Sequence, residues 1–534
     1  VKHYSGMPYQ SIAYCLDAAG LKSTELDVIA LSSLSRIADL GYLFDIEAGV
    51  SEYVITRDGN MAQIGRPVPP GGLSKLPLYI RKLPVAAPTI LMHVEHHLSH
   101  AASAYYTSGN AQTQLVVTAD GQGDGIPLAV WRGERGRLTL LKSFPSSASL
   151  GWFYGNVTEA LGWWQGDGEG KTMGLAPYGD PARVSGLLDP YCPRFAGGDL
   201  AREHDFGTPY GWNEAGAYHW HLEDSGKIRD LVEQHGAEHV AAEAQRILEE
   251  QVAALVYPWM DRIGTRNLTC AGGIFLNVKL NQRLWCSGRL GAQHIYPNPG
   301  DSGLAAGAAL QAHHQLNPQA PIGDLPHLYW GPEYADDEIA RVLAERNLPA
   351  SFEKDIAGRV AGLLADNRIV GWLQGRMESG PRALGGRSIL MSPTRAENKD
   401  VINARVKFRE PFRPFCPSIL AEDAPSYLEN YRPERFMITS FDAAPDKRDR
   451  IPAVVHADGT VRPQTVEQKV NPLYWRLIDQ FKQHTGVPVL LNTSLNIRGE
   501  PMICTPREAI RCFYDSGLDY LALGSYLLAK PGGA

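Results

Sequence analysis

Short, uninterrupted apolar runs that alternate with helix-like segments constrain the fold of this chain more than any other feature. The runs at residues 86–92, 114–118, 268–271 and 369–373 show no regular alternation of polar and apolar residues, which is typical of strands buried on both faces. A long helix is expected at 238–260, where apolar residues recur along one stripe. Strands and helices that alternate in this way predict an α/β fold.

A proline-rich segment divides the chain. The 534 residues are enough for several domains, at roughly 150 residues per domain. Residues 317–332 contain four prolines and no long helical pattern, which makes this segment the best candidate for a linker. We therefore expect a first domain at 1–325 and a second domain at 326–534.

Composition and charge argue against several classes of protein. The net charge of −7, from 51 Lys and Arg against 58 Asp and Glu, argues against a nucleic-acid-binding protein. The seven cysteines form no C-x-x-C pair, which disfavours a zinc ribbon, a thioredoxin-type site and a disulfide scaffold. Without an apolar run long enough for a membrane-spanning helix, we expect a cytoplasmic enzyme with no membrane partner.

The densest group of histidines lies at 93–100. His96 and His100 are four positions apart, so on a helix both imidazoles lie on one face and can bind the same metal ion. A surface helix with several histidines is the simpler explanation. No H-E-x-x-H sequence is present, which disfavours a zincin protease.

Two glycine-rich segments supply carboxylates that could complete a metal site. Asp120 follows a buried strand in the segment 118–125, where glycines let backbone N–H groups approach phosphate oxygens. The alternative for this segment is a hairpin turn. Asp301 precedes a helix of small residues at 304–310, where its alternative role is that of an N-cap.

A third glycine-containing segment predicts a nucleotide site. Gly272 and Gly273 follow a strand and precede a helix that carries Asn277, so a nucleotide can lie against the backbone there. No G-x-G-x-x-G or Walker A lysine motif is present, which disfavours dinucleotide enzymes and P-loop enzymes. The segment 168–174 lacks the spacing of a phosphate loop, and we expect a loop there.

The second half of the chain contains a strongly basic segment. Residues 376–413 include seven Arg and two Lys against four acidic residues, a net charge of +5. Arginines clustered around glycines are typical of sites that bind phosphate or carboxylate, and glycine and proline disfavour a regular solvated helix here. The polar segment 492–500 follows a strand expected at 488–491. We therefore expect a second anion site in this half.

Seven stretches, in order along nearly the whole chain, carry a more specific signal. In the first half they are E-H-H-L-S-H-A-A-S-A-Y (95–105), G-E-G-K-T-M-G-L-A-P-Y-G (168–179), A-G-G-I-F-L-N-V-K-L-N (271–281) and N-P-G-D-S-G-L-A-A-G-A-A (298–309). In the second half they are G-R-M-E-S-G-P-R-A-L-G-G-R-S-I-L (375–390), F-R-E-P-F-R-P-F-C-P-S (408–418) and L-N-T-S-L-N-I-R-G-E-P (491–501). With these motifs the chain resembles the O-carbamoyltransferases of natural-product biosynthesis, the family of the tobramycin carbamoyltransferase TobZ and the nodulation protein NodU.

The resemblance implies a fold and a reaction. The first domain would be an actin-like ATPase (ASKHA) domain like that of the tRNA-modifying transferase TsaD, and the second a YrdC-like α/β domain. The second domain would make carbamoyl-adenylate from carbamoyl phosphate and ATP, with Mg(II) accompanying the ATP. The first domain would transfer the carbamoyl group to a hydroxyl of a small-molecule acceptor.

The resemblance also implies roles for individual residues. A metal ion, Fe(II) or another divalent ion, would be held by His96, His100, Asp120 and Asp301, and the first three of these residues would take part in catalysis. The adenylate would lie along Gly272, Gly273 and Asn277. Carbamoyl phosphate and ATP would be held by Arg376, Arg382, Arg387, Lys407, Arg413, Ser494, Asn496 and Arg498. In this second group Arg382, Lys407 and Ser494 would be catalytic.

The chain departs from the family pattern at two places. Family members open with a segment that contains a His-Asp pair and would here precede Val1. The candidate general base is the histidine of that segment, so no base is assigned. Ser379 stands where an aromatic residue is common in the family.

Other functions remain as alternatives. A tRNA threonylcarbamoyl-type transferase is disfavoured by the acidic net charge and by the fused second domain. A hydrogenase-maturation carbamoyltransferase would need C-x-x-C pairs, and a non-catalytic nucleotide-binding regulator would be expected to lack the histidine pair or the arginines. The sequence does not identify the acceptor molecule, and it leaves a homodimer open. The aromatic residues at 152–154 and 163–164 line an acceptor pocket or belong to the core.

Overall fold

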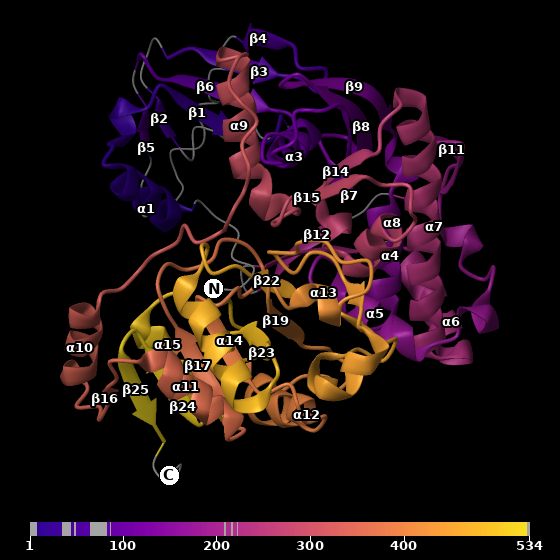
Figure 1. Cartoon of the computed structure of the whole chain (residues 1–534). Helices are drawn as coiled ribbons and strands as arrows, with labels where there is room; N and C mark the ends of the chain where they lie inside the picture. The colour runs from indigo at the N-terminus through magenta and orange to yellow at the C-terminus, as the bar shows by residue number, and fades with distance from the viewer. Residues whose placement is uncertain are drawn as a thin grey trace.

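The computed structural model describes residues 8–34, 44–46, 50–64, 83–85, 87–207, 210–214, 217–221 and 223–530. Two α/β parts make up the molecule, one from the first half of the chain and one from the second half (Figure 1). The α/β fold expected from the alternating pattern is confirmed.

The first part contains two main sheets. One has the strand order β1-β6-β3-β4, in which β6 (Ile90–Val94) runs parallel to β1 (Val28–Leu31) and β3 (Glu52–Ile55), and β4 (Met61–Ile64) is antiparallel to β3. Next to it lie α1 (Tyr9–Ala19) and the pair β2 (Phe44–Ile46) and β5 (Leu83–Val85). The expected strand at 86–92 is found slightly later, as β6.

The other main sheet has the order β15-β14-β7-β8-β9. The strands β7 (Gln114–Gly123), β8 (Ile126–Glu134) and β9 (Arg137–Phe144) form an antiparallel meander, and β14 (Asn267–Ala271) and β15 (Ala292–Ile295) add to it in parallel. The chain thus turns back twice in tight connections and then crosses over through helices, as parallel pairing requires.

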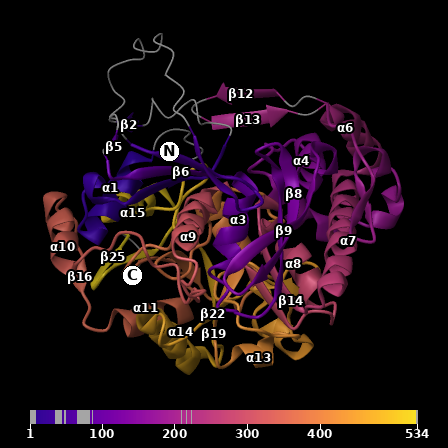
Figure 2. The same cartoon turned by 90° about the horizontal axis from the view of Figure 1, so that it is seen from above.

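Two packed helices lie between these two sheets. Helix α3 (His96–Tyr105) contacts β7 and β14, whereas α9 (Leu304–Leu316) contacts β1 and β6. Figure 2 shows α3 and α9 side by side, with β6 on one side and β8 and β9 on the other. Two sheets separated by a helix pair fit the actin-like ATPase fold expected for the first domain.

The opposite face of the second sheet is covered by α4 (Leu150–Ala160) and the long α7 (Ala237–Ile263). The expected helix at 238–260 is therefore confirmed. The remaining elements of this part are α5 (Glu169–Leu175), α6 (Asp224–His235), α8 (Val278–Trp285), β10 (Arg194–Ala196), β11 (Asp199–Arg202), β12 (Tyr210–Glu214) and β13 (Ala217–His221). The loop expected at 168–174 is wrong, because α5 incorporates both Gly170 and Gly174.

The second part is built on one sheet of eight strands, in the order β16-β25-β24-β17-β18-β23-β19-β22. The strands are β16 (Ser351–Phe352), β25 (Tyr526–Ala529), β24 (Tyr520–Leu523), β17 (Val370–Leu373), β18 (Arg387–Met391), β23 (Val489–Ser494), β19 (Cys416–Leu420) and β22 (Gln464–Val466). Only the pairs β17–β24 and β19–β22 are parallel among those described. Helices α11 (Ile356–Ala365) and α14 (Pro472–Thr485) pack against each other and on the sheet.

Shorter elements complete this part. They are α10 (Asp336–Glu345), α12 (Asn398–Ile402), a π-helical turn at Asn403–Lys407, α13 (Ala424–Tyr427), α15 (Pro506–Asp515), and the pair β20 (Phe441–Asp442) and β21 (Thr460–Val461). A large apolar core of this part is built from buried residues between 339 and 528, and Trp285 of α8 packs against it. The core around β7 and α7 draws on 115–295 and on one residue of the second half, Ile438. The domain boundary at 325 and 326 stays a prediction.

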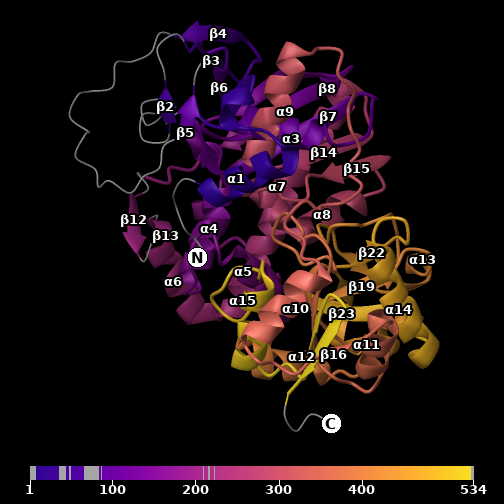
Figure 3. The same cartoon turned by 90° about the vertical axis from the view of Figure 1, so that its left-hand side faces the viewer.

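Helix α8 joins the two parts (Figure 3). The side-chain amide of Asn281 donates to the carbonyl of Ile438 across 2.7 Å, and the indole N–H of Trp285 donates to the carbonyl of Asn430 across 2.7 Å. The Ser440 hydroxyl donates to the side chain of Gln282. Because the bonds from Asn281 and to Gln282 are buried, α8 fixes the position of the second part against the first.

Candidate functional site

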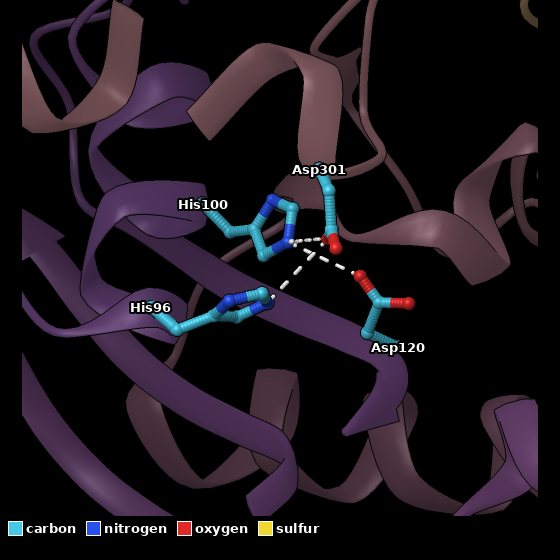
Figure 4. A group of neighbouring side chains, drawn as sticks. All are labelled: His96, His100, Asp120 and Asp301. Atoms are coloured by element: carbon cyan, nitrogen blue, oxygen red, sulfur yellow. Dashed lines mark hydrogen bonds and ion pairs between the residues drawn. The ribbon is translucent and has the colours of Figure 1, made fainter. Parts of the chain in front are cut away.

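Four side chains from three distant segments meet in the first part (Figure 4). His96 and His100 lie one turn apart on α3, with ring centroids 4.8 Å apart. Asp120 comes from β7, and Asp301 opens the short 3-10 turn Asp301–Gly303 before α9. One nitrogen or oxygen of each side chain lies within 4.8 Å of those of the other three. We call these four residues the His–Asp cluster.

The chemistry of the His–Asp cluster fits a divalent metal ion. His100 Nε2 lies 3.2 Å from Asp120 Oδ2 and 3.5 Å from Asp301 Oδ1, and His96 Nε2 lies 3.6 Å from the same Asp301 oxygen. His96 Nε2 is buried and finds no hydrogen-bond partner within the part of the chain that the structure describes. Two imidazoles and two carboxylates form a donor set that Fe(II) and other divalent transition metals accept.

The charges of the His–Asp cluster are strongly coupled. Burial disfavours the charged form of His100, but the adjacent carboxylates of Asp120 and Asp301 outweigh it and raise the pKa of His100 to about 9. Burial likewise opposes the ionised form of Asp120, yet hydrogen bonding and charge from His100 hold the pKa of Asp120 well below its ordinary value. Burial and the neighbouring His100 lower the pKa of His96.

Glycines allow the backbone to come close to the His–Asp cluster. A Cβ at Gly123 would lie 2.1 Å from the His96 ring, so only glycine fits there. Gly272 has φ +101, and a Cβ at Gly273 would lie 2.9 Å from the Asp120 carboxylate. The backbone N–H of Gly273 donates to Asp120 Oδ2 across 3.1 Å. The glycine pair expected beside a nucleotide therefore also supports a residue of the cluster.

The alternatives considered for the two aspartates apply elsewhere. The N-cap of α9 is Gly303, and the Asp301 side chain is 70% exposed, so Asp301 does not cap that helix. The hairpin turn between β7 and β8 is formed by Asp124, which has φ +43 and whose carboxylate accepts from the backbone N–H of His96. Asp120 lies before that turn and points toward His100.

Two polar residues near the His–Asp cluster have structural contacts. His97 is buried, and its nitrogens bond to the Thr118 hydroxyl at 2.8 Å and to the Ile126 carbonyl at 2.9 Å. Burial holds the pKa of His97 well below its ordinary value, so this imidazole is neutral. Asn277 caps α8 and exchanges hydrogen bonds with Gln245 of α7 at 2.8 and 3.0 Å. These contacts favour a structural role for Asn277 beside the adenylate-binding role that the sequence predicted.

The basic segment forms a group of closely spaced cations in the second part. Burial and the charges of Arg462 and Arg413 lower the pKa of Arg382 to about 9, and burial and the charge of Arg413 lower that of Arg409 to about 9. Arg382 Nε is buried and has no partner among the described residues. Cations that repel one another and offer N–H donors are typical of a site for a multiply charged anion. We call Arg382, Arg409, Arg413 and Arg462 the arginine cluster.

Lys407 lies next to the arginine cluster, at the end of the π-helical turn. Its ammonium donates to Asn496 Oδ1 at 2.7 Å and to backbone carbonyls of Ser494 and Asn496. Burial and the charges of Arg409 and Arg413 hold the pKa of Lys407 well below its ordinary value. The structure thus brings together three of the residues predicted for the second site.

Three other predicted arginines have different surroundings. Arg387 is fully buried and donates to the backbone carbonyls of residues 332, 374, 375, 386 and 504, which favours a structural role over the expected contact with cofactor. Arg376 bonds to the Tyr14 hydroxyl of α1 at 2.9 Å. Arg498 donates to the Phe408 carbonyl at 3.2 Å.

Two cations of the arginine cluster were missed as site residues. Arg409 belongs to the basic segment itself, so its position in the sequence could have identified it as a site residue. Arg462 lies outside that segment, and its guanidinium reaches Cys416 Sγ at 2.7 and 3.0 Å. Nothing in the sequence around Arg462 indicated this proximity, because the fold of the second part creates it.

The aromatic candidates for an acceptor pocket separate into core and surface residues. Phe153 and Tyr154 are buried. Trp152 lies beside the turn after Asp120, where a Cβ at Gly121 would come within 3.1 Å of its indole nitrogen. Trp164 is exposed. Trp152 therefore lies next to the turn that follows Asp120.

A small cavity of about 50 Å³ lies between the two parts. Met173, Tyr178, Val278 and Lys279 line it from the first part, and Phe412, Phe415, His456, Asp458 and Arg462 from the second. Arg462 therefore borders both this cavity and the arginine cluster.

One α/β part thus carries side chains that could hold a metal ion, and the other carries clustered arginines, an arrangement that suits an enzyme acting on an anionic substrate. Sequence comparison makes this specific: the profile of the carbamoyltransferase N-terminus matches residues 1–310, and that of the carbamoyltransferase C-terminus matches residues 361–530. The chain belongs to the carbamoyltransferase family and is a carbamoyltransferase.

Relatives cover most of the chain. Nodulation protein NolNO of Sinorhizobium fredii is 35% identical over 547 residues, 99% of this chain and 75% of its own length. Nodulation protein NolO of Bradyrhizobium diazoefficiens is 37% identical over 454 residues, 82% of this chain and 79% of its own length. Among solved structures, HypF of T. kodakarensis is 15% identical, with a TM-score of 0.26 over 43% of this chain and 38% of its own. None of the helices within the described residues combines the length and apolarity needed to span a membrane.

Proposed function

We propose that this carbamoyltransferase is an ATP-dependent O-carbamoyltransferase with two active sites. The arginine cluster and Lys407 would form carbamoyl-adenylate from carbamoyl phosphate and ATP, and the His–Asp cluster would serve the transfer of the carbamoyl group to a hydroxyl. The observation that carries the proposal is the arginine cluster, whose partly buried cations repel one another and therefore favour an anionic ligand that offsets their charge.

The first reaction consists of two bond exchanges at the arginine cluster. Water cleaves carbamoyl phosphate to carbamate and inorganic phosphate. An oxygen of carbamate then attacks the α-phosphorus of ATP, pyrophosphate leaves with Mg(II), and carbamoyl-adenylate remains. Guanidinium groups such as that of Arg382 stabilise the negative charge that develops on the phosphate oxygens. Lys407, Ser494 and Asn496 form one hydrogen-bonded group that orients the reactants.

Four predicted arginines lie outside this hydrogen-bonded group and would contribute to substrate binding in different ways. Arg413 would bind phosphate oxygens, while Arg376 and Arg498 lie on surface loops at the edge of the site. Arg387 would hold the loop that carries Arg382, because it joins that loop to residues 332 and 504.

The second reaction takes place in the first domain. The acceptor oxygen attacks the carbamoyl carbon, the bond to the adenylate oxygen breaks, AMP leaves, and the hydroxyl proton passes to a base. Gly272, Gly273 and Asn277 would line the adenylate. A divalent ion such as Fe(II), held by His96, His100, Asp120 and Asp301, would act as a Lewis acid at this site.

The acceptor belongs to the same proposal. We infer a hydroxylated small molecule of the antibiotic or natural-product type, modified in the cytoplasm where ATP is available. With the domain division that the sequence predicts at residues 325 and 326, each domain would carry one reaction.

The proposal is tested by incubating the protein with ATP and carbamoyl phosphate and measuring pyrophosphate and phosphate. Both products should appear, and omission of either substrate should abolish pyrophosphate release. A panel of hydroxylated natural products with labelled carbamoyl phosphate should then show transfer of label. Absence of pyrophosphate with ferrous iron and magnesium present would refute the proposal.

A further inference from the structure

A contact between the two parts lies beside the arginine cluster. Lys171 of α5 forms an ion pair with Glu410, with Nζ 3.2 Å from Oε1. Both side chains are largely buried, with exposed fractions of 22% and 27%. The Lys171 ammonium also lies 5.6 Å from the centre of the Trp163 ring, and this ring packs on that of Phe412 at 5.9 Å. An aromatic pair and a cation–π contact thus fix the ion pair in place.

The partner of Lys171 in this contact is shared with the arginine cluster. Glu410 Oε2 lies 3.7 Å from Arg413 Nη1, which is longer than the roughly 2.8 Å of a charge-assisted hydrogen bond. Burial opposes ionisation of Glu410, but bonds from its own backbone and from Lys171, together with the charges of Lys171 and Arg413, lower its pKa. Glu410 is therefore ionised and is held between two cations.

The position of Glu410 decides how much of Arg413 is free to bind an anion. The two residues are only three positions apart in the sequence, and the Arg413 N–H already donates to the Glu410 carbonyl. Without Lys171, the carboxylate could close the remaining distance and engage the guanidinium through two parallel hydrogen bonds, the preferred geometry of an arginine–carboxylate pair. Such a pair would occupy the donors that a phosphate needs.

We propose that Lys171, in the first domain, is a positioning residue for the anion site of the second domain. It draws Glu410 away from Arg413 and so keeps the Arg413 guanidinium available for phosphate. The inference rests on the proposed function for the identity of the substrate, but the binding of phosphate to the arginine cluster does not depend on turnover. It also means that the two domains share one site, since α5 contributes to binding at the arginine cluster.

The test compares Lys171→Met and Lys171→Arg with a matched control. Lys142→Met removes an ion pair with Asp199 at 3.5 Å and a cation–π contact with Phe144 at 5.8 Å, and Lys142 lies on β9, in the first domain. We expect Lys171→Met to raise KM for carbamoyl phosphate and Kd for inorganic phosphate about tenfold, a change of about 1.4 kcal/mol. The kcat for pyrophosphate release should change less than about threefold, as expected for a lost ground-state contact. Lys171→Arg and Lys142→Met should behave like the wild type.

A second variant separates positioning from a general structural effect. Adding Glu410→Gln to Lys171→Met removes the charge that would capture Arg413, so the double variant should regain most of the affinity for phosphate. A structural role for Lys171 predicts instead a lower melting temperature and no recovery. Unchanged affinity in Lys171→Met, or a double variant as weak as the single one, would overturn the inference. A wild type that binds phosphate but releases no pyrophosphate would refute the proposed function alone.

Discussion

Lys407 and Asn496 are 89 positions apart in the sequence, yet the Lys407 ammonium donates to Asn496 Oδ1 across 2.7 Å and to the Asn496 carbonyl across 3.0 Å. Asn496 Oδ1 also accepts from the Ser494 hydroxyl at 2.8 Å. The buried Lys407 ammonium thus connects the loop after β23 to the π-helical turn, which is part of the basic segment. Because π-helical turns are rare and often lie at functional sites, this junction is where we expect substitutions to separate chemistry from stability.

Replacing Lys407 by Met should lower both the stability of the protein and its activity in pyrophosphate release. Its acceptors on residues 494 and 496 would be left without their donor, which costs about 1–3 kcal/mol in the free energy of unfolding. Pyrophosphate release should fall at least about 100-fold, as for the loss of a charge-stabilising donor. The control is Lys482→Met, which breaks the ion pair between Lys482 of α14 and Asp423. Denaturant unfolding and the pyrophosphate assay measure the two effects, and full activity of Lys407→Met would contradict the assigned role.

Arg382 and Arg387 should respond oppositely to removal. Arg382→Ala should reduce pyrophosphate release by about 100- to 1000-fold with little change in melting temperature, because it removes a buried cation that is repelled by Arg462 and Arg413. Arg387→Met should lower the free energy of unfolding by about 3 kcal/mol or more, because it leaves several buried carbonyls unsatisfied. Thermal unfolding and steady-state kinetics distinguish the two. Equal destabilisation by both variants would argue that Arg382, too, is structural.

The His–Asp cluster should bind metal, and the transfer step should depend on it. His100→Ala should lose bound iron, measured by elemental analysis, and should lose carbamoyl transfer while pyrophosphate release continues. His313→Ala is the control, since His313 lies exposed near the end of α9. Chelation of the wild type should have the same effect as His100→Ala, and ferrous iron should reverse it. Transfer at the wild-type rate after complete removal of metal would exclude the metal role.

The stability of the protein should decrease in mild acid. Burial, together with the charge of Arg432, lowers the pKa of His294 from 6.5 to about 4, although Asp324 opposes this shift. Between these two values the unfolded chain binds a proton that the folded chain does not, so the free energy of unfolding should fall as pH drops from about 6.5 to about 4. His294→Gln should flatten this dependence, whereas the exposed His484→Gln should not. A slope for His294→Gln equal to that of the wild type would contradict this assignment.

Local spacing predicted the His–Asp cluster well. The four-residue spacing of His96 and His100 places their rings on one face of α3, and the glycine-rich segments that contain Asp120 and Asp301 supplied the candidate carboxylates that the structure brings to these rings. Periodicity also predicted the helix at 238–260, which the structure has as α7 (Ala237–Ile263). These features depend on neighbours in the sequence, so the sequence contains them directly.

Long-range contacts could not be predicted in the same way. The sequence does not distinguish Arg387 from Arg382, because both lie in the same basic segment. The fold distinguishes them, because it surrounds Arg387 with carbonyls from residues 332 and 504. Arg462 joins the arginine cluster because β22 and the residues before it lie beside β19. The segment 168–174 is helical where we expect a loop, because packing of α5 against α7 overrides the low helix propensity of its glycines.

The docking of α8 has a consequence for how such a chain can evolve. Ile438 completes the apolar core of the first part, and Asn281 and Trp285 of α8 bond to the second part. Each half therefore depends on the other to complete its contacts at this interface. Exchange of one half for that of another lineage would leave polar groups on α8 without partners and an apolar gap at Ile438. The two catalytic halves should consequently be inherited together, and residues on both sides of the interface should change in concert.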